Sequence, residues 1–143
     1  MKRNLKIDEL SIVIPIYNEG KNIKKLWLEI KRSLDLKKLE IIFVDDDSKD
    51  NTEKILKQIN NIDKKVKFVI RKNKIKDLSR SCMLGFKNSN YKNILVMDGD
   101  LQHDPKYIKK FINKFNTSSS DIVVWPSFSF SIHIKQTSPL KTK

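Results

Sequence analysis

Two aspartates one residue apart, Asp98 and Asp100, directly follow an apolar run at residues 93–97. Two carboxylates held this close repel each other, and a divalent cation removes that cost. Mg²⁺ and Mn²⁺ favour carboxylate oxygens, and Mg²⁺ commonly binds through one or two carboxylates together with substrate phosphates. Gly99 between them leaves room for a ligand to approach the backbone. The alternative is a solvated turn, because Asp and Gly are ordinary turn residues.

Two further polar clusters follow apolar runs. Residues 17–19 (Tyr-Asn-Glu) follow the run at 11–16, and residues 45–48 (Asp-Asp-Asp-Ser) follow the run at 39–44. The carboxylates of the second cluster could accept hydrogen bonds from a nucleobase or from ribose hydroxyls, or they could cap the next helix together with Ser48 or Asp50. Tyr17 fits stacking on a ring or packing in the core equally well.

Basic residues gather at positions 71–80. Among Arg71, Lys72, Lys74 and Arg80, the candidate for a phosphate contact is Arg80, because its guanidinium is a forked donor. For the other three we expect a solvated basic face. His103 fits a surface histidine best, and Cys82 fits a buried packing residue.

Composition narrows the setting of this chemistry. The 143 residues are enough for one domain. The net charge of +13 favours anionic partners, although the lysines are dispersed, as compositional bias would leave them. A single cysteine excludes a disulfide within the chain and favours a reducing compartment. Because the chain shows neither a signal peptide nor a membrane span, we expect a cytoplasmic protein, with at most peripheral contact to the cytoplasmic face of a membrane.

The elements that carry these clusters alternate along the chain. Apolar runs predict strands at 11–16, 39–44, 66–70, 93–97 and 121–124. Helical spacing predicts a helix at 22–34, one bearing Ile55, Leu56 and Ile59, one at 79–86, and one that starts at Pro105. This order predicts an α/β three-layer sandwich of the Rossmann-like kind, with a mostly parallel sheet and helices on both faces. Ligands of such sheets bind beyond the carboxyl ends of the strands, so the three clusters should share one edge.

The segment at 125–143 differs from the rest. It is rich in Ser, Thr and Lys and lacks a sustained period. We therefore expect one domain at 1–124 and a divergent tail at 125–143.

Three segments resemble the inverting family-two glycosyltransferases, which have the GT-A fold. Residues 15–19 (Pro-Ile-Tyr-Asn-Glu) resemble the opening of that family, residues 43–52 resemble its VDDxSxDxT segment, and residues 96–105 are similar to its metal-binding DADLQHPP stretch. The last form is typical of the branch that includes the dolichol-phosphate mannosyltransferases and the bacterial polyprenyl-phosphate glycosyltransferases. The resemblance covers about residues 10–124.

The resemblance implies a role for each matching position. Asp98, Asp100 and Gln102 would hold Mg²⁺ or Mn²⁺ against the diphosphate of a nucleotide sugar, a GDP- or UDP-sugar. The expected substrate-binding residues are Pro15, Tyr17 and Glu19 around the nucleoside, Asp45 and Asp46 at the base, and Arg80 at the phosphates. The acceptor would be a polyprenyl or dolichyl phosphate, and the transferred sugar would be mannose or glucose. The segment at 125–143 does not match the acceptor side of the family, so a truncated acceptor half is expected.

Two other hypotheses come from different classes. The chain could be a non-catalytic remnant that binds a nucleotide sugar or an anionic lipid without transferring sugar. Nucleic-acid binding would rest on charge alone, because the sequence shows no helix-turn-helix, stacking platform or basic stripe. We therefore expect no nucleic-acid partner.

Overall fold

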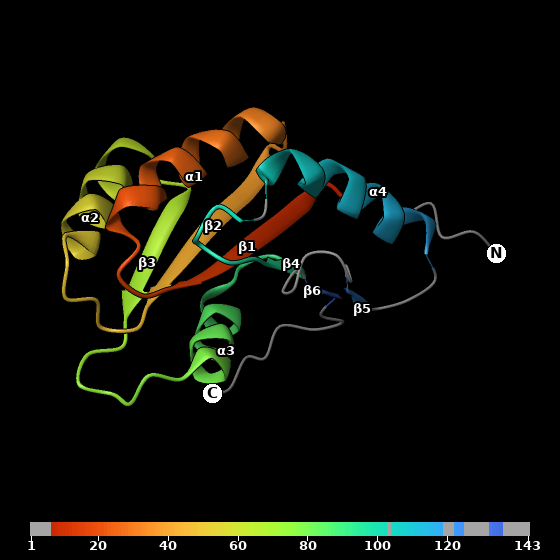
Figure 1. Ribbon diagram of the computed structural model, residues 1–143. Helices are drawn as coiled ribbons and strands as arrows, with labels where there is room; N and C mark the ends of the chain where they lie inside the picture. Colours follow the sequence, from red (N-terminus) through yellow and green to blue (C-terminus); the bar gives the residue numbers. More distant parts are fainter. Residues whose placement is uncertain (1–6, 103, 119–121, 125–131, 136–143) are drawn as a thin grey trace.

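The computed structural model describes residues 7–102, 104–118, 122–124 and 132–135. Its centre is a six-stranded sheet in the order β3-β2-β1-β4-β6-β5 (Figure 1). The strands are β1 (Glu9–Ile16), β2 (Lys38–Asp45), β3 (Val66–Ile70), β4 (Asn93–Val96), β5 (Ile122–Val124) and β6 (Ile132–Lys135). The helices are α1 (Gly20–Ser33), α2 (Thr52–Ile62), α3 (Leu78–Asn88), the short 3₁₀ turn η1 (Pro105–Tyr107) and α4 (Ile108–Thr117).

Four neighbouring strands run parallel. β1 pairs with β2 and β4, and β2 pairs with β3, all in parallel register. β6 is antiparallel to both of its neighbours, β4 and β5. Because the four parallel strands point the same way, the loops that follow them meet at one edge of the sheet.

Helices cover both faces of the sheet, α1, α2 and α4 on one and α3 on the other (Figure 1). Alternate residues of β1 face opposite sides, as the pleat of a strand requires. Ile12 and Ile14 belong to the larger core under α1 and α2, while Val13 belongs to the smaller core under α3. Burial on both faces explains why the runs at 11–16 and 39–44 are apolar without interruption.

The helices pack by one apolar stripe each. In α1 the buried positions Ile23, Leu26, Trp27 and Ile30 recur at helical spacing, and Lys31 and Arg32 lie in the last turn, where cations favour the helix dipole. α3 approaches the sheet closely at Gly85, where a Cβ would overlap the Val13 side chain. Glycine at this position therefore sets the distance between α3 and β1.

The predicted elements are found, with small shifts at their ends. α1 begins at Gly20 rather than at residue 22, and α3 runs over 78–88 rather than 79–86. The strand predicted at 121–124 is found as β5 and forms the edge of the sheet, while β6 at 132–135, which was not predicted, lies between β4 and β5. Ile132 and Ile134 alternate with polar residues, a period-two signal over only four positions. Residue 121 lies outside the described residues.

Candidate active site

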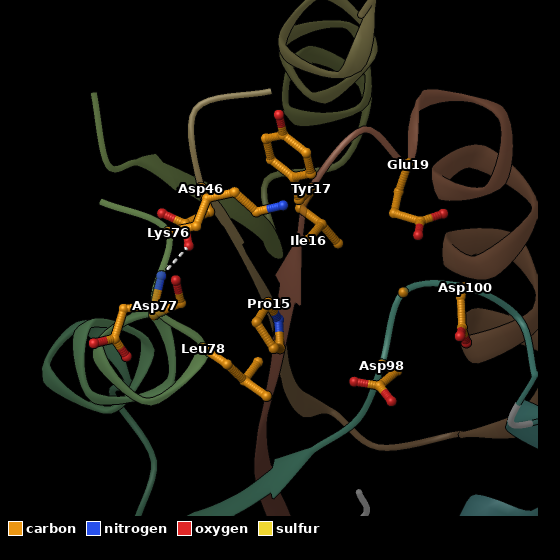
Figure 2. A pocket seen from close by; sticks show the side chains of 12 residues that line it. Pro15, Ile16, Tyr17, Glu19, Asp46, Lys76, Asp77, Leu78, Asp98 and Asp100 are labelled. Atoms are coloured by element: carbon orange, nitrogen blue, oxygen red, sulfur yellow. Dashed lines mark hydrogen bonds between the residues drawn. The ribbon is translucent and has the colours of Figure 1, made fainter. Parts of the chain in front are cut away.

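A pocket of about 370 Å³ opens at the edge where β1, β2 and β4 end (Figure 2). Its size lies in the range of pockets that bind small ligands. Its walls come from segments far apart in the sequence, and the lining residues are Pro15, Ile16, Tyr17, Glu19, Asp46, Lys76, Asp77, Leu78, Ser81, Asp98, Gly99 and Asp100. All three polar clusters of the sequence thus contribute to one pocket.

Asp98 and Asp100 line the same side of this pocket, across from Asp77 and Leu78 (Figure 2). Gly99 lets the loop lie against the end of β1, since a Cβ there would be 2.5 Å from Ile16 Cγ2. The backbone N–H of Gln102 donates to Asp100 Oδ1 over 3.0 Å and helps to close the turn. A carboxylate oxygen that accepts one hydrogen bond keeps a second lone pair for another partner.

The loop after β1 contributes Tyr17 and Glu19, and Glu19 lies near the loop of Asp98 and Asp100, since a Cβ on Gly99 would be 3.8 Å from Glu19 Cγ (Figure 2). Asn22 Nδ2 donates to Glu19 Oε2 over 2.8 Å, which fixes the carboxylate near the start of α1. The Lys76 ammonium lies over the Tyr17 ring, 3.4 Å from its centroid. Tyr17 therefore presents its ring to the pocket and to a cation instead of closing the core.

The aspartates at the end of β2 and in the loop that follows it have different roles. Asp46 lines the pocket, whereas Asp45 does not. The Asp45 carboxylate accepts hydrogen bonds from the backbone and hydroxyl of Ser48. Burial raises the pKa of Asp45, and the hydrogen bonds from Ser48 only partly offset it. Asp50 accepts from the backbone N–H of Thr52 and of Gly20. Asp45 and Asp50 thus hold the loop, and Asp46 is the member turned to the pocket.

Arg71 is not part of a solvated basic face, so that prediction was wrong for this residue. It is 8% exposed, and its Nη1 pairs with Asp46 Oδ1. The same Nη1 also donates to the Asp77 carbonyl over 3.3 Å and to Ser81 Oγ over 3.4 Å, while Nη2 donates to the Ile75 carbonyl. Asp46 Oδ2 accepts from the Asp77 backbone N–H over 2.8 Å. The buried pair therefore ties β2 to the loop that forms the pocket wall.

The basic residue that lines the pocket is not the one that the sequence suggested. Arg80 does not line the pocket; its side chain is 77% exposed and pairs with Asp77 over 3.4 Å. Lys76, which the sequence did not single out, lies in the pocket. Its only signal was its position in the loop after the third predicted strand. Lys72 and Lys74 are exposed, as expected.

Three other predicted residues have simpler outcomes. Gln102 is exposed, does not line the pocket and contributes its backbone N–H to the turn. Residue 103, the predicted surface histidine, lies outside the described residues. Cys82 packs against the core under α3, as predicted, but is only half-buried, and burial raises the pKa of its thiol.

The donor set fits a hard divalent cation only if the ligand completes it. Within residues 7–102, 104–118, 122–124 and 132–135, no group of three or more His, Cys, Asp or Glu side chains is arranged to hold a metal. Asp98 and Asp100 are two carboxylates at one pocket wall, which suits Mg²⁺ or Mn²⁺ when substrate phosphates supply other oxygens. None of the helices in the described part of the chain is long and apolar enough to cross a bilayer.

Comparison with known proteins agrees with this architecture. The chain is 38% identical over 116 residues to dolichol-phosphate mannosyltransferase of Pyrococcus furiosus, covering 81% of this chain and 32% of that protein. It is 31% identical to dolichol-phosphate mannosyltransferase of Saccharomyces cerevisiae, covering 76% of this chain and 41% of that protein.

Solved structures share the fold at lower identity. The mannosyltransferase PcManGT from Pyrobaculum calidifontis, in complex with GDP-Man and Mn²⁺, superimposes with a TM-score of 0.65 at 16% identity, over 78% of this chain and 32% of that one. Residues 1–349 of TarS from S. aureus, in complex with UDP, superimpose with a TM-score of 0.66 at 22% identity, over 80% of this chain and 34% of that one.

The chain spans about a third to a half of the length of the curated relatives that it matches. The match to the family itself extends from residue 11 to residue 142 and so continues beyond Val124. With its parallel sheet, its flanking helices and this match, the chain belongs to Glycosyl transferase family 2 and has the GT-A fold.

Proposed function

We propose that this chain forms the donor site of a glycosyltransferase that moves a hexose from a nucleotide sugar to a polyprenyl phosphate. The observation that carries the proposal is the convergence of Tyr17, Asp46, Asp98 and Asp100 on one pocket. The relatives named as dolichol-phosphate mannosyltransferases support the acceptor class and favour mannose over glucose. The neighbours in complex with GDP-Man and with UDP support a nucleotide sugar as the donor.

Each side chain has a role in this proposal. Tyr17 stacks on the base, and Asp46, held by Arg71, accepts a hydrogen bond from it. Glu19 borders the nucleoside side of the pocket. Asp98 and Asp100 hold Mg²⁺ or Mn²⁺ at the diphosphate. The bound cation supplies a Lewis acid that stabilises negative charge on the departing nucleoside diphosphate.

The acceptor chemistry follows from charge. A polyprenyl phosphate is already an anion and can attack the anomeric carbon without losing a proton to a protein base. Attack from the face opposite the leaving diphosphate would invert the anomeric carbon, and Asp98 and Asp100 would retain that diphosphate through the cation that they hold.

Calorimetric titration tests the donor site. GDP, UDP, GDP-mannose and UDP-glucose are titrated into the chain with and without Mn²⁺. We expect binding that requires the cation and that falls at least about tenfold in Asp98→Asn and in Asp100→Asn, since each loses a charged ligand of the cation. Asp35→Asn removes the same charge from an exposed position outside the pocket and serves as the matched control.

The three possible outcomes have different meanings. Absence of cation-dependent binding by the wild-type chain, or equal binding by the three variants, would refute the donor site. Binding without transfer of radiolabelled sugar to dolichyl phosphate would favour a non-catalytic nucleotide-sugar-binding protein. Binding with transfer supports the enzyme.

A further inference from the structure

One lysine lies in an otherwise acidic pocket. Among the described residues that line it, five carry carboxylates, and Lys76 is the one cation: Glu19, Asp46, Asp77, Asp98 and Asp100 against a single ammonium. Arg71 pairs with Asp46 from behind the wall, and Arg80 pairs with Asp77 at the outer side. An anionic ligand that enters this pocket therefore meets Lys76 as the cation on the lining itself.

The Lys76 ammonium contacts the ring of Tyr17. The ammonium lies 3.4 Å from the centroid of the tyrosine ring, well within the range of a cation–π interaction (Figure 2). Figure 2 shows the lysine side chain reaching from the β3–α3 loop toward the ring at the end of β1. The ammonium thus covers the ring face on which a base would stack.

Lys76 is also free to change partners. Residues 72–76 are all exposed, and a lysine stem has four rotatable carbons that carry a point charge. Its two neighbours Ile75 and Asp77 are tied through their carbonyls to Arg71, which fixes the loop under the side chain. The backbone can therefore stay in place while the ammonium swings from the ring to another acceptor in the pocket.

We propose that Lys76 is a specificity-determining residue that exchanges the Tyr17 ring for the diphosphate of the incoming nucleotide. This inference rests on the proposed function, because it takes the ligand to be a nucleoside diphosphate or its sugar ester. In the empty pocket the ammonium covers Tyr17. When the nucleotide binds, the base takes the ring face and the ammonium pairs with phosphate oxygens. A nucleoside without phosphates must displace the lysine and offers it no anion in return, so the exchange selects for diphosphates.

Binding constants for two ligands and four proteins test the exchange. GDP or UDP with Mn²⁺, whichever the wild-type chain binds, is titrated by calorimetry, and the corresponding nucleoside is titrated by NMR. The proteins are the wild type, Lys76→Met, Lys76→Arg and Lys74→Met. Lys74 is the matched control, because it belongs to the same exposed loop and does not line the pocket.

We expect Lys76→Met to bind the diphosphate about tenfold more weakly, the usual effect of losing one charge-assisted hydrogen bond. Its affinity for the nucleoside should stay the same or rise, because the ring face is no longer covered. Lys76→Arg should keep the diphosphate affinity within about threefold, since the charge remains. Lys74→Met should match the wild type for both ligands.

The results that would overturn the exchange are distinct from failure of the donor site. A wild-type chain that binds no nucleotide with Mn²⁺ removes the proposed function and this inference together. A wild-type chain that binds the diphosphate, with Lys76→Met no weaker than Lys74→Met, overturns the inference alone. Equal loss of nucleoside and diphosphate affinity in Lys76→Met also overturns it, because that pattern indicates a general role in pocket shape.

Discussion

The buried ion pair between Arg71 and Asp46 should contribute strongly to the stability of the fold. Arg71 is 8% exposed and Asp46 is 7% exposed, so both charges are largely shielded from water. We expect Arg71→Met to destabilise the folded chain by about 3–5 kcal/mol, because it leaves the Asp46 carboxylate buried without a cation. That is a large part of the 5–15 kcal/mol that stabilises a typical domain.

The pair can be separated from its hydrogen bonds by a double-mutant cycle. Arg71→Lys keeps the charge but loses the forked contacts to the carbonyls of Ile75 and Asp77. It should cost about 1–2 kcal/mol. Asp46→Asn combined with Arg71→Met removes both charges and should recover a substantial part of the loss, because no buried charge is left.

Urea denaturation measures the wild type, Arg71→Met, Arg71→Lys, Asp46→Asn and the double variant. The free energy of unfolding comes from the midpoint and slope of each transition, and circular dichroism of the folded baselines checks that each variant is folded. A loss below about 1 kcal/mol in Arg71→Met would refute the claim that the pair is buried and coupled. So would an equal loss in the Asp46→Asn background, because it would show that Arg71 acts independently of Asp46.

Two further predictions concern stability away from the pocket. Gly85→Ala should lower the free energy of unfolding by about 1–3 kcal/mol in urea denaturation, because its new Cβ overlaps the Val13 side chain. Val13→Ala in the same chain should restore part of that loss. Independent effects of the two changes would contradict the close packing. Burial opposes ionisation of Glu40, but hydrogen bonds from Lys67, Ser11 and Asn90 outweigh it and lower the pKa of this carboxyl below 4.5. Its contribution to stability is therefore present above that value and is lost as the pH falls through the lower folded-state pKa. Glu40→Gln should lower the free energy of unfolding at pH 7 and show a shallower loss of stability than the wild type between pH 5 and pH 3. Parallel pH profiles of the two proteins would contradict this.

The sequence allowed the sheet and its edge to be predicted because local patterns determine both. β-branched runs predict strands buried on both faces, and helices between them require parallel neighbours. Once the strands are parallel, residues 17–19, 45–48 and 98–100 must lie at one edge. The convergence of Tyr17, Asp46 and Asp98 therefore follows from topology, without knowledge of any side-chain contact.

The roles of the basic residues could not be predicted in the same way. Arg71 and Lys76 belong to a segment without periodicity, and the path of that segment decides which side chain turns inward. Arg71 is drawn inside by the Asp46 carboxylate, a long-range partner that local patterns do not reveal. The strand β6 was missed for a related reason. It has only four residues, too few for a clear period-two pattern, and its partner β4 lies far from it in the sequence.

The loops around the pocket are held in strained conformations that fix its shape. The loops that follow β1, β2, β3 and β4 each contain one non-glycine residue with positive φ: Asn18 (53°), Asp47 (64°), Asn73 (56°) and Leu101 (62°). Such conformations persist only where the surroundings hold them.

The loops hold one another. Asn18 Oδ1 accepts from the Lys49 backbone N–H over 2.8 Å, and Asp47 Oδ2 accepts from the Asn73 backbone N–H over 3.3 Å. The first contact joins the loop of β1 to that of β2, and the second joins the loop of β2 to that of β3. These two contacts restrain the loops that follow β1, β2 and β3. We therefore expect discrimination between ligands to come from side chains at the pocket surface, and the long, exposed side chain of Lys76 is the one that can carry its charge from one partner to another.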